Sequence, residues 1–279
     1  MPLITAPTLN QIHATTEWLC QEEHPNPDLE YVLNLILLGR LPQDQGELLA
    51  IAHTTATPKT LKPDDICGAL MASPDNQRVS LAGRDSITTE TLLSLVQARG
   101  CPQRIATSLP SRDWVRSHLL RDYQLQREHI SLTMVCTQVP AEGQGRWATP
   151  EDKPALQAYL EANQAERGIR IVPHDWDALI QQKRVAVLEH GGQVVSVMKR
   201  GSTLHHGMIV GAFTFAPYRR RGFGRQLLSF VLRELFQEFS AVKLWVDDDN
   251  WGAIALYKFL GFQPIGSYYT GYFADPRSR

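Results

Sequence analysis

The chain is poor in cysteine and contains no long apolar run. Its four cysteines are Cys20, Cys67, Cys101 and Cys136, which are widely spaced and form no C-x-x-C pair. This spacing favours free thiols over a disulfide framework, and we expect no metal site. No stretch of 18 or more apolar residues occurs, and residues 1–19 carry no basic segment followed by an apolar run. We therefore expect no membrane span and a cytoplasmic location.

An excess of charge of one sign is also missing. The 28 Lys and Arg residues balance 29 Asp and Glu residues, which leaves a formal net charge of -1. Such a chain has no overall field to attract a polyanion, so no nucleic-acid partner is expected. What is present is ample apolar material, 43% of 279 residues, which fits a soluble globular protein with one large domain or two smaller ones.

The best candidate for a domain boundary is the segment 140–146, which is rich in Gly and polar residues. It predicts one domain over residues 1–140 and a second over 145–279. In the first domain the patterns predict three strands, over 48–52, 66–71 and 78–81, followed by a helix over 88–99. A strand over 105–108, a helix over 113–122 and a final strand over 129–135 come next.

The second half shows the same order of elements. A helix is expected from Thr149, followed by a hairpin over 185–198 and a strand over 208–215. A long helix with an apolar stripe from Phe223 to Phe239 follows, then a strand over 242–246, a short helix over 251–260 and the last strands over 262–273. Both halves are predicted to be α/β, each with a mixed, mostly antiparallel sheet flanked by helices.

A glycine-rich turn separates the third strand of the second half from the long helix. Arg219, Gly222 and Gly224 form the pattern R-x-x-G-x-G, with further arginines at 220, 221 and 225. Glycines let the backbone approach a ligand, and the helix N-terminus presents free N–H groups to an anion. The pattern is typical of pyrophosphate binding, although a Gly-rich turn alone is also consistent with a tight connection.

A second pattern surrounds the short helix near the C-terminus. It has the form N-x-x-A-x-x-L-Y-x-x-x-G-F, with Asn250 at its start, Tyr257 in its middle and Gly261–Phe262 at its end. Taken singly, Asn250 is consistent with a helix cap, and Tyr257 with an aromatic residue on the apolar face.

In this order the two patterns resemble the GNAT superfamily of acyl-CoA N-acetyltransferases. The resemblance implies a GNAT domain in the second half, with acetyl-CoA held between its splayed strands, and the same order of elements in the first half predicts tandem GNAT-like domains. The cofactor-binding residues that it implies comprise a strand that pairs with pantetheine, the phosphate loop and two residues of the second pattern, namely Phe213, Thr214, Phe215, Arg219, Arg220, Arg221, Gly222, Phe223, Gly224, Arg225, Asn250 and Tyr257.

The activity implied by this resemblance is N-acetyltransfer, in which a primary amine of a small molecule or peptide attacks the thioester directly. Tyr257 is the expected general acid for the departing thiolate, because a phenol with a pKa near 10 is protonated at neutral pH. His206 is a candidate general base, since it replaces a Glu that many relatives place near the start of this strand. A water chain or an amine that binds already neutral is the alternative.

The first half lacks both patterns. Asp85 stands where a pyrophosphate would lie, so we interpret this half as a degenerate GNAT-like domain. A non-catalytic acyl-CoA-binding or regulatory module is the alternative function, but it would not need Tyr257. A transferase that uses aminoacyl-tRNA is disfavoured by the balanced charge. The amine acceptor and the oligomeric state cannot be read from these residues.

Overall fold

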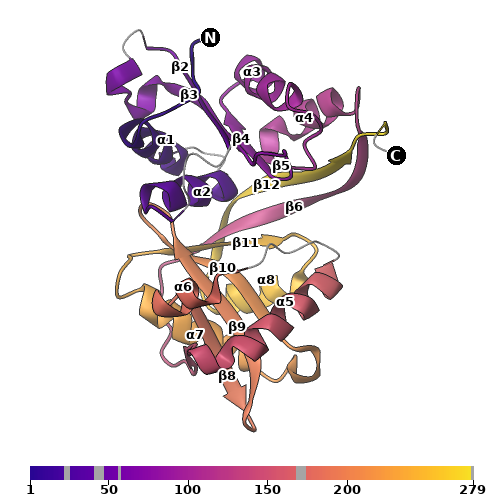
Figure 1. The fold of residues 1–279 in the computed structure, drawn as a ribbon. Coiled ribbons are helices and arrows are strands. Elements are labelled where there is room, and N and C mark those ends of the chain that lie inside the picture. Colours follow the sequence, from indigo (N-terminus) through magenta and orange to yellow (C-terminus); the bar gives the residue numbers. More distant parts are fainter. Residues whose placement is uncertain (22–25, 41–46, 56–57, 168–173, 278–279) are drawn as a thin grey trace. The chain divides into compact units, whose positions relative to one another are not determined.

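A computed structural model describes residues 1–21, 26–40, 47–55, 58–167 and 174–277 (Figure 1). The chain forms two compact units. Unit 1 contains Met1–Thr133 with the later segments Val246–Trp251 and Pro264–Arg279, and unit 2 contains Met134–Trp245 with Gly252–Gln263. In the described part of the chain, no helix is both long and apolar enough to cross a membrane.

Unit 1 has a sheet with the strand order β1-β2-β3-β4-β5-β12-β6. β4 and β5 run parallel, whereas β1 with β2, β2 with β3, β3 with β4, and β5 with β12 run antiparallel. Its elements are β1 Leu3–Ile4, α1 Leu9–Gln21, α2 Pro27–Leu37, β2 Leu48–His53, η1 Pro58–Thr60, η2 Pro63–Asp65, β3 Ile66–Ala72, β4 Val79–Gly83, α3 Ser86–Gln97, β5 Arg104–Ser108, η3 Leu109–Ser111, α4 Arg112–Leu119, β6 Gln124–Cys136 and β12 Gln263–Ala274, of which the end of β6 from Met134 and the first residue of β12, Gln263, belong to unit 2.

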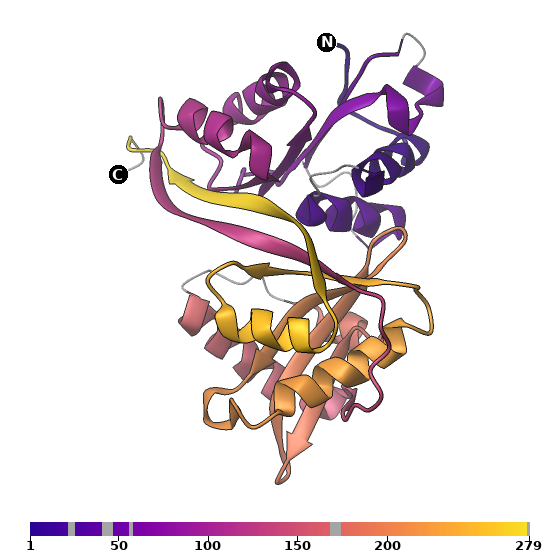
Figure 2. The same ribbon diagram turned by 180° about the vertical axis from the view of Figure 1, so that it is seen from behind.

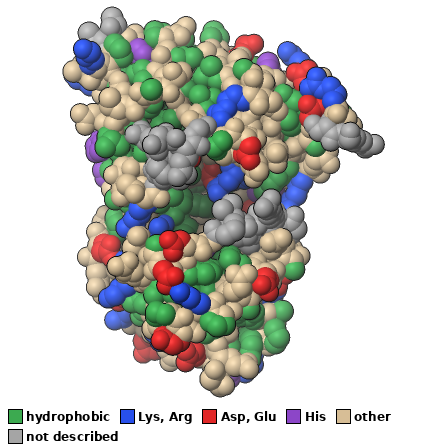
Figure 3. Space-filling view, viewed as in Figure 1, with side chains coloured by type: hydrophobic (Ala, Val, Ile, Leu, Met, Phe, Trp, Pro, Cys, Tyr) green, Lys and Arg blue, Asp and Glu red, His purple; other side chains and the backbone are tan. Residues whose placement is uncertain are grey.

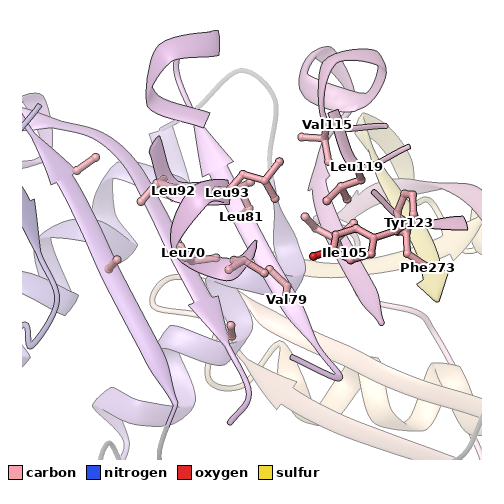
Figure 4. Close-up of a cluster of buried hydrophobic side chains, with 14 of the residues drawn as sticks. Leu70, Val79, Leu81, Leu92, Leu93, Ile105, Val115, Leu119, Tyr123 and Phe273 are labelled. Atoms are coloured by element: carbon pink, nitrogen blue, oxygen red, sulfur yellow. The ribbon is translucent and has the colours of Figure 1, made fainter. Parts of the chain in front are cut away.

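Helices cover both faces of this sheet because alternate strand residues point to opposite sides. Leu70 joins a buried cluster with side chains of α3 and α4, including Leu92 and Val115 (Figure 4). Its neighbour Ala69 joins a second cluster formed with α1 and α2, which includes Trp18. β3 is therefore apolar on both faces, and all seven of its residues are buried.

Unit 2 has a sheet with the order β11-β10-β9-β8-β7. β10 and β11 run parallel, and the other neighbouring pairs run antiparallel. Its elements are β7 Arg146–Trp147, η4 Pro150–Asp152, α5 Lys153–Arg167, α6 Trp176–Gln181, β8 Val185–His190, β9 Gln193–Ser202, β10 Gly207–Thr214, η5 Ala216–Tyr218, α7 Phe223–Leu235, β11 Val242–Asp247 and α8 Trp251–Phe259, of which the end of β11 and Trp251 belong to unit 1.

Helices α5 and α6 lie on one face of the unit 2 sheet, and α7 and α8 on the other (Figures 1 and 2). The apolar stripe of α7 explains its place, because Leu227, Leu228, Val231, Leu232 and Leu235 are all buried. Each such side chain contributes about 1.5–3 kcal/mol on burial. The helix ends at Leu235, one turn before the predicted end at residue 239.

The aromatic residues near the C-terminus lie on one strand, β12, and the prediction of several strands there is wrong. β12 pairs with β5, with Tyr268 opposite Ser108 and Tyr272 opposite Arg104. Tyr268 and Tyr269 are only 2% and 0% exposed. The alternation of apolar and polar residues within one strand could not reveal this pairing, because the partner strand lies far away in the sequence.

Acidic and basic side chains are interspersed on the face of the molecule that Figure 3 shows. This mixture agrees with the formal net charge of -1.

Candidate functional site

Strands β10 and β11 diverge within unit 2. Their parallel pairing runs from Gly207 opposite Val242 to Ile209 opposite Leu244, whereas β10 continues to Thr214. At the point of divergence the register of β10 against β9 shifts between Ile209 and Gly211. This β-bulge bends the strand and increases its twist, which explains why the two strands separate there.

The end of β10 turns alternate backbone groups to opposite edges. The C=O of Phe213 accepts a hydrogen bond from Ser196 Oγ at 2.8 Å, and the N–H of Phe215 donates to the Val195 C=O at 3.1 Å. These two residues therefore direct their backbone groups toward β9. Alternation turns those of Thr214 toward the diverging side. Of the three residues expected to pair with pantetheine, Thr214 has the fitting orientation.

The glycine-rich loop has two left-handed residues just before α7. Arg220 has φ 62° and Gly222 has φ 85°, a region that glycine enters without strain. Gly222 occupies the N-cap position of α7, where no side chain caps the helix. The first N–H groups of α7 are therefore not capped by a side chain, which makes the helix start a suitable anion site.

The glycines also allow close approach. A Cβ added at Gly222 would meet no described atom within 4 Å, whereas one at Gly224 would lie 3.2 Å from Thr214 Oγ1. Gly224 thus lets the first turn of α7 pack closely on the end of β10. The loop, the start of α7 and the end of β10 therefore lie next to one another.

The arginines of the loop do not share one environment. Arg219 donates from Nε to the Thr214 C=O at 2.7 Å and from Nη2 to Glu166, so it holds the loop. Arg221 stacks on Phe223, with its Cζ 5.2 Å from the ring centre, and Arg225 stacks on Phe259 at 5.5 Å. Both side chains are exposed, as is that of Arg220. These three arginines are the better candidates for contact with phosphate.

A pocket of about 380 Å³ adjoins Arg225. Part of its wall is the segment 138–144, which corresponds to the predicted linker. This segment is packed against α7, since a Cβ at Gly143 would lie 2.3 Å from the Phe230 nitrogen and the Gln144 N–H donates to the Gln226 C=O. The linker thus forms an integral part of unit 2.

Tyr257 lies on α8 and is 7% exposed. Its ring centre is 5.8 Å from that of Phe262, whose N–H donates to the Tyr257 C=O at 3.0 Å. Gly261, with φ 89°, provides the left-handed turn that ends the helix. The glycine and the Phe of the second pattern therefore fix the position of Tyr257.

Asn250 lies in the turn between β11 and α8, and it belongs to unit 1. Its N–H donates to the Asp247 C=O at 3.0 Å.

His206 lies at the other end of β10 from Thr214. It is half-buried in the turn before the strand, where its C=O accepts from the Thr203 N–H at 2.9 Å. β10 has eight residues, so His206 is about 25 Å from Thr214 at roughly 3.3 Å per residue. The structure does not bring His206 to the loop.

A polar pair that the sequence patterns did not indicate lies beside the bulge of β10. Lys199 Nζ is 2.6 Å from His174 Nε2, and Lys199 pairs with Gly211 across the sheet. The ammonium group can only donate, so the imidazole accepts at Nε2 and carries its proton on Nδ1. Tyr159 lies beneath the ammonium, 5.9 Å from Nζ to its ring centre. The contact between His174 and Lys199 could not be predicted from the sequence, because neither residue belongs to a recognisable motif.

In unit 1, the corresponding helix start and strand end after the parallel pair β4 and β5 are engaged by side chains of the chain itself. Asp85 caps α3, since its Oδ1 accepts from the Thr88 N–H at 2.7 Å. Asn26 donates from Nδ2 to the Leu81 C=O at 2.9 Å, at the last residue of β4 that pairs with β5. Unit 1 therefore lacks the open edge and the uncapped helix start of unit 2.

Residues 148–262 match the Acetyltransferase (GNAT) family. No curated protein matches the chain in sequence.

Solved structures resemble nearly the full length of the chain. An acetyltransferase from the GNAT family of Colwellia psychrerythraea has a TM-score of 0.59 at 12% identity, with 98% of this chain and 99% of that chain covered. A Drosophila protein has a TM-score of 0.67 at 14% identity, covering 97% and 98%. A tandem GNAT protein from the clavulanic acid biosynthesis pathway has a TM-score of 0.58 at 15% identity, covering 98% of both chains. The predicted fold class, two GNAT-like domains in tandem, is confirmed.

Proposed function

We propose that the protein transfers an acetyl or short acyl group from CoA to a primary amine of a small molecule or peptide, because residues 148–262 match the Acetyltransferase (GNAT) family. One observation supports this proposal above the others. The left-handed loop that ends at Gly222 opens directly onto the uncapped start of α7, beside the diverging end of β10. This arrangement offers backbone donors for a diphosphate and an extended edge for an amide-bearing arm.

The binding roles follow from these groups. The N–H groups at the start of α7 hold the diphosphate, and the exposed Arg220, Arg221 and Arg225 neutralise its charge. The N–H of Thr214 pairs with the pantetheine arm, since its C=O accepts from Arg219, and an N–H on this edge polarises the thioester carbonyl. Arg219 keeps the loop in place.

The pocket beside Arg225 is the natural place for the nucleotide end of CoA. Phe259 is 69% exposed and carries the Arg225 guanidinium on its face, so together they offer a planar surface and a positive charge.

Proton transfer is assigned to Tyr257. Its hydroxyl donates a proton to the departing CoA sulfur as the amine bonds to the carbonyl carbon, so no covalent acyl-enzyme is formed. His206, at the far end of β10, is too distant to accept the proton of the amine. We therefore favour the alternative in which the amine loses this proton to water. Lys199 and His174, beside the bulge, are proposed to line the acceptor side.

Calorimetric titration with acetyl-CoA and its longer acyl homologues tests the binding step. A panel of amines, followed by free-thiol release, then tests the transfer. Absence of CoA binding at high micromolar concentration would refute the proposal. Binding without thiol release from any amine would favour the non-catalytic acyl-CoA module.

A further inference from the structure

Unit 1 contains a pocket of about 430 Å³ to which the transfer reaction assigns no role. It lies beyond the last paired residues of β4 and β5, Leu81 and Thr107. Helices α1, α3 and α4 contribute to its wall. The described residues that matter for its chemistry are Trp18, Arg84, Asp85, Ser108, Ser111 and Trp114.

This pocket does not suit a phosphorylated ligand. The start of α3, which would otherwise attract an anion, is capped by the Asp85 carboxylate. Arg84 directs its guanidinium onto Trp18, with its Cζ 5.7 Å from the ring centre. One positive and one negative side chain therefore adjoin in the lining, and their charges cancel. An uncharged ligand avoids the cost of removing an ion from water.

The walls favour a flat ring. Trp18 and Trp114 both line the pocket, and aromatic side chains give large contact areas to planar groups. Trp18 is only 1% exposed, and its Nε1 is buried without an acceptor among the described residues. This donor is closed off from solvent, so the donors that a ligand carbonyl can reach are the hydroxyl groups of the lining. Ser108 Oγ and Ser111 Oγ, 3.3 Å apart, add hydroxyl groups at the rim.

We propose that this pocket binds an uncharged planar ring compound that carries a carbonyl acceptor, such as an aromatic carboxamide or a lactam. The inference uses residues of unit 1 alone, so it stands independently of the proposed acetyltransfer.

Three compounds of nearly equal size test the proposal: benzamide, benzoate and benzamidine, which are neutral, anionic and cationic. The full-length protein is labelled with ¹⁵N, and the indole N–H signals of its six tryptophans are followed by NMR. Trp18→Phe and Trp114→Phe assign the signals of these two residues. Benzamide is expected to shift the Trp18 signal saturably, with a Kd of the order of 1 mM for so small a ligand. The two charged compounds are expected to bind at least tenfold more weakly.

Two variants locate the binding. Trp114→Ala removes one wall and Ser111→Phe fills the rim, and each is expected to weaken benzamide binding about tenfold or more. Trp251→Ala is the matched control, because Trp251 is 75% exposed and does not line the pocket. No saturable shift of the Trp18 signal, equal binding of benzoate or benzamidine, or unchanged binding in Ser111→Phe would overturn the proposal. Should Trp114→Ala fail to fold, Ser111→Phe decides.

Discussion

Arg219 and Glu166 form a two-oxygen ion pair between the glycine-rich loop and α5. Arg219 Nη2 lies 2.6 Å from one carboxylate oxygen of Glu166 and 2.7 Å from the other. The side chains are 41% and 42% exposed, so the pair itself contributes about 0–1 kcal/mol. Its role follows from the second contact of Arg219, to the C=O of Thr214, which joins loop, strand and helix.

Glu166→Gln is therefore expected to raise the KM for acetyl-CoA about two- to fivefold and to leave kcat nearly unchanged, because the loop loses one tether and no reacting group changes. Steady-state kinetics at low salt provide the measurement. Glu238→Gln is the matched control, since it breaks the Arg200–Glu238 ion pair elsewhere in unit 2. An equal effect of both substitutions would contradict this role for Arg219.

Gly222→Ala is expected to weaken acetyl-CoA binding at least tenfold and to destabilise the fold by about 1–2 kcal/mol. An alanine at φ 85° is strained, and relief of this strain would move the N–H groups of the loop. Gly252→Ala is the control, because Gly252 is helical and has open space around its Cα. It should keep binding intact and leave stability equal or higher. Calorimetry and thermal unfolding measure both effects, and unchanged binding in Gly222→Ala would count against the loop as the diphosphate site.

Tyr257→Phe is expected to lower kcat roughly 100-fold and to leave acetyl-CoA affinity nearly intact, since only the proton donor is removed. Tyr218→Phe, which removes a hydroxyl bonded to Gln193 at 2.7 Å, is the matched control with kcat expected to be near that of the unmodified protein. Thiol release and calorimetry separate the two parameters. Equal turnover of both variants would remove Tyr257 from the acid role.

One molecule of acetyl-CoA is expected to bind per chain. In unit 1 the helix start is capped by Asp85 and the strand edge is occupied by Asn26, which donates to the Leu81 C=O. Calorimetry should give a stoichiometry near one, and Gly222→Asp in unit 2 should abolish all binding. Residual binding in that variant would show that unit 1 retains a CoA site.

Asp28 is expected to make stability depend on pH in the acid range. Burial raises the pKa of this carboxyl, but Arg104 at 3.2 Å and Arg78 outweigh it, and the pKa falls to about 2. Because this pKa is lower in the folded state, the ionised carboxylate stabilises the fold at pH values above the pKa of the unfolded state, near 3.8. This stabilisation is lost as the pH falls toward 2. The contribution is about 2 kcal/mol.

Asp28→Asn is accordingly expected to lower the free energy of unfolding by several kcal/mol at pH 7, because Arg104, whose side chain is only 18% exposed, loses its charge partner. The difference in unfolding free energy from the unmodified protein should shrink by about 2 kcal/mol between pH 4 and pH 2. Denaturant unfolding at several pH values measures it, with the exposed Asp64→Asn as control. A difference independent of pH would contradict the assignment.

Local patterns were sufficient for most elements of the fold. The stripe of α7, the apolar run of β3 and the left-handed turn at Gly261 each depend on residues that lie close together in the sequence. The resemblance of residues 148–262 to the GNAT family was recognisable for the same reason, since each of the two motifs is a short continuous stretch of sequence. Helices α1 and α2, in contrast, were not predicted.

The sequence by itself determined the tandem fold and the conformation of the glycine-rich loop, because helix caps, glycine conformations and apolar periodicity are encoded locally. Only the tertiary structure decided which groups meet across long separations. In the folded chain β12 pairs with β5, and Arg219 forms an ion pair with Glu166. Lys199 contacts His174, and His206 lies at the far end of β10. These pairings depend on how strands and helices pack in three dimensions, and no spacing along the chain specifies them.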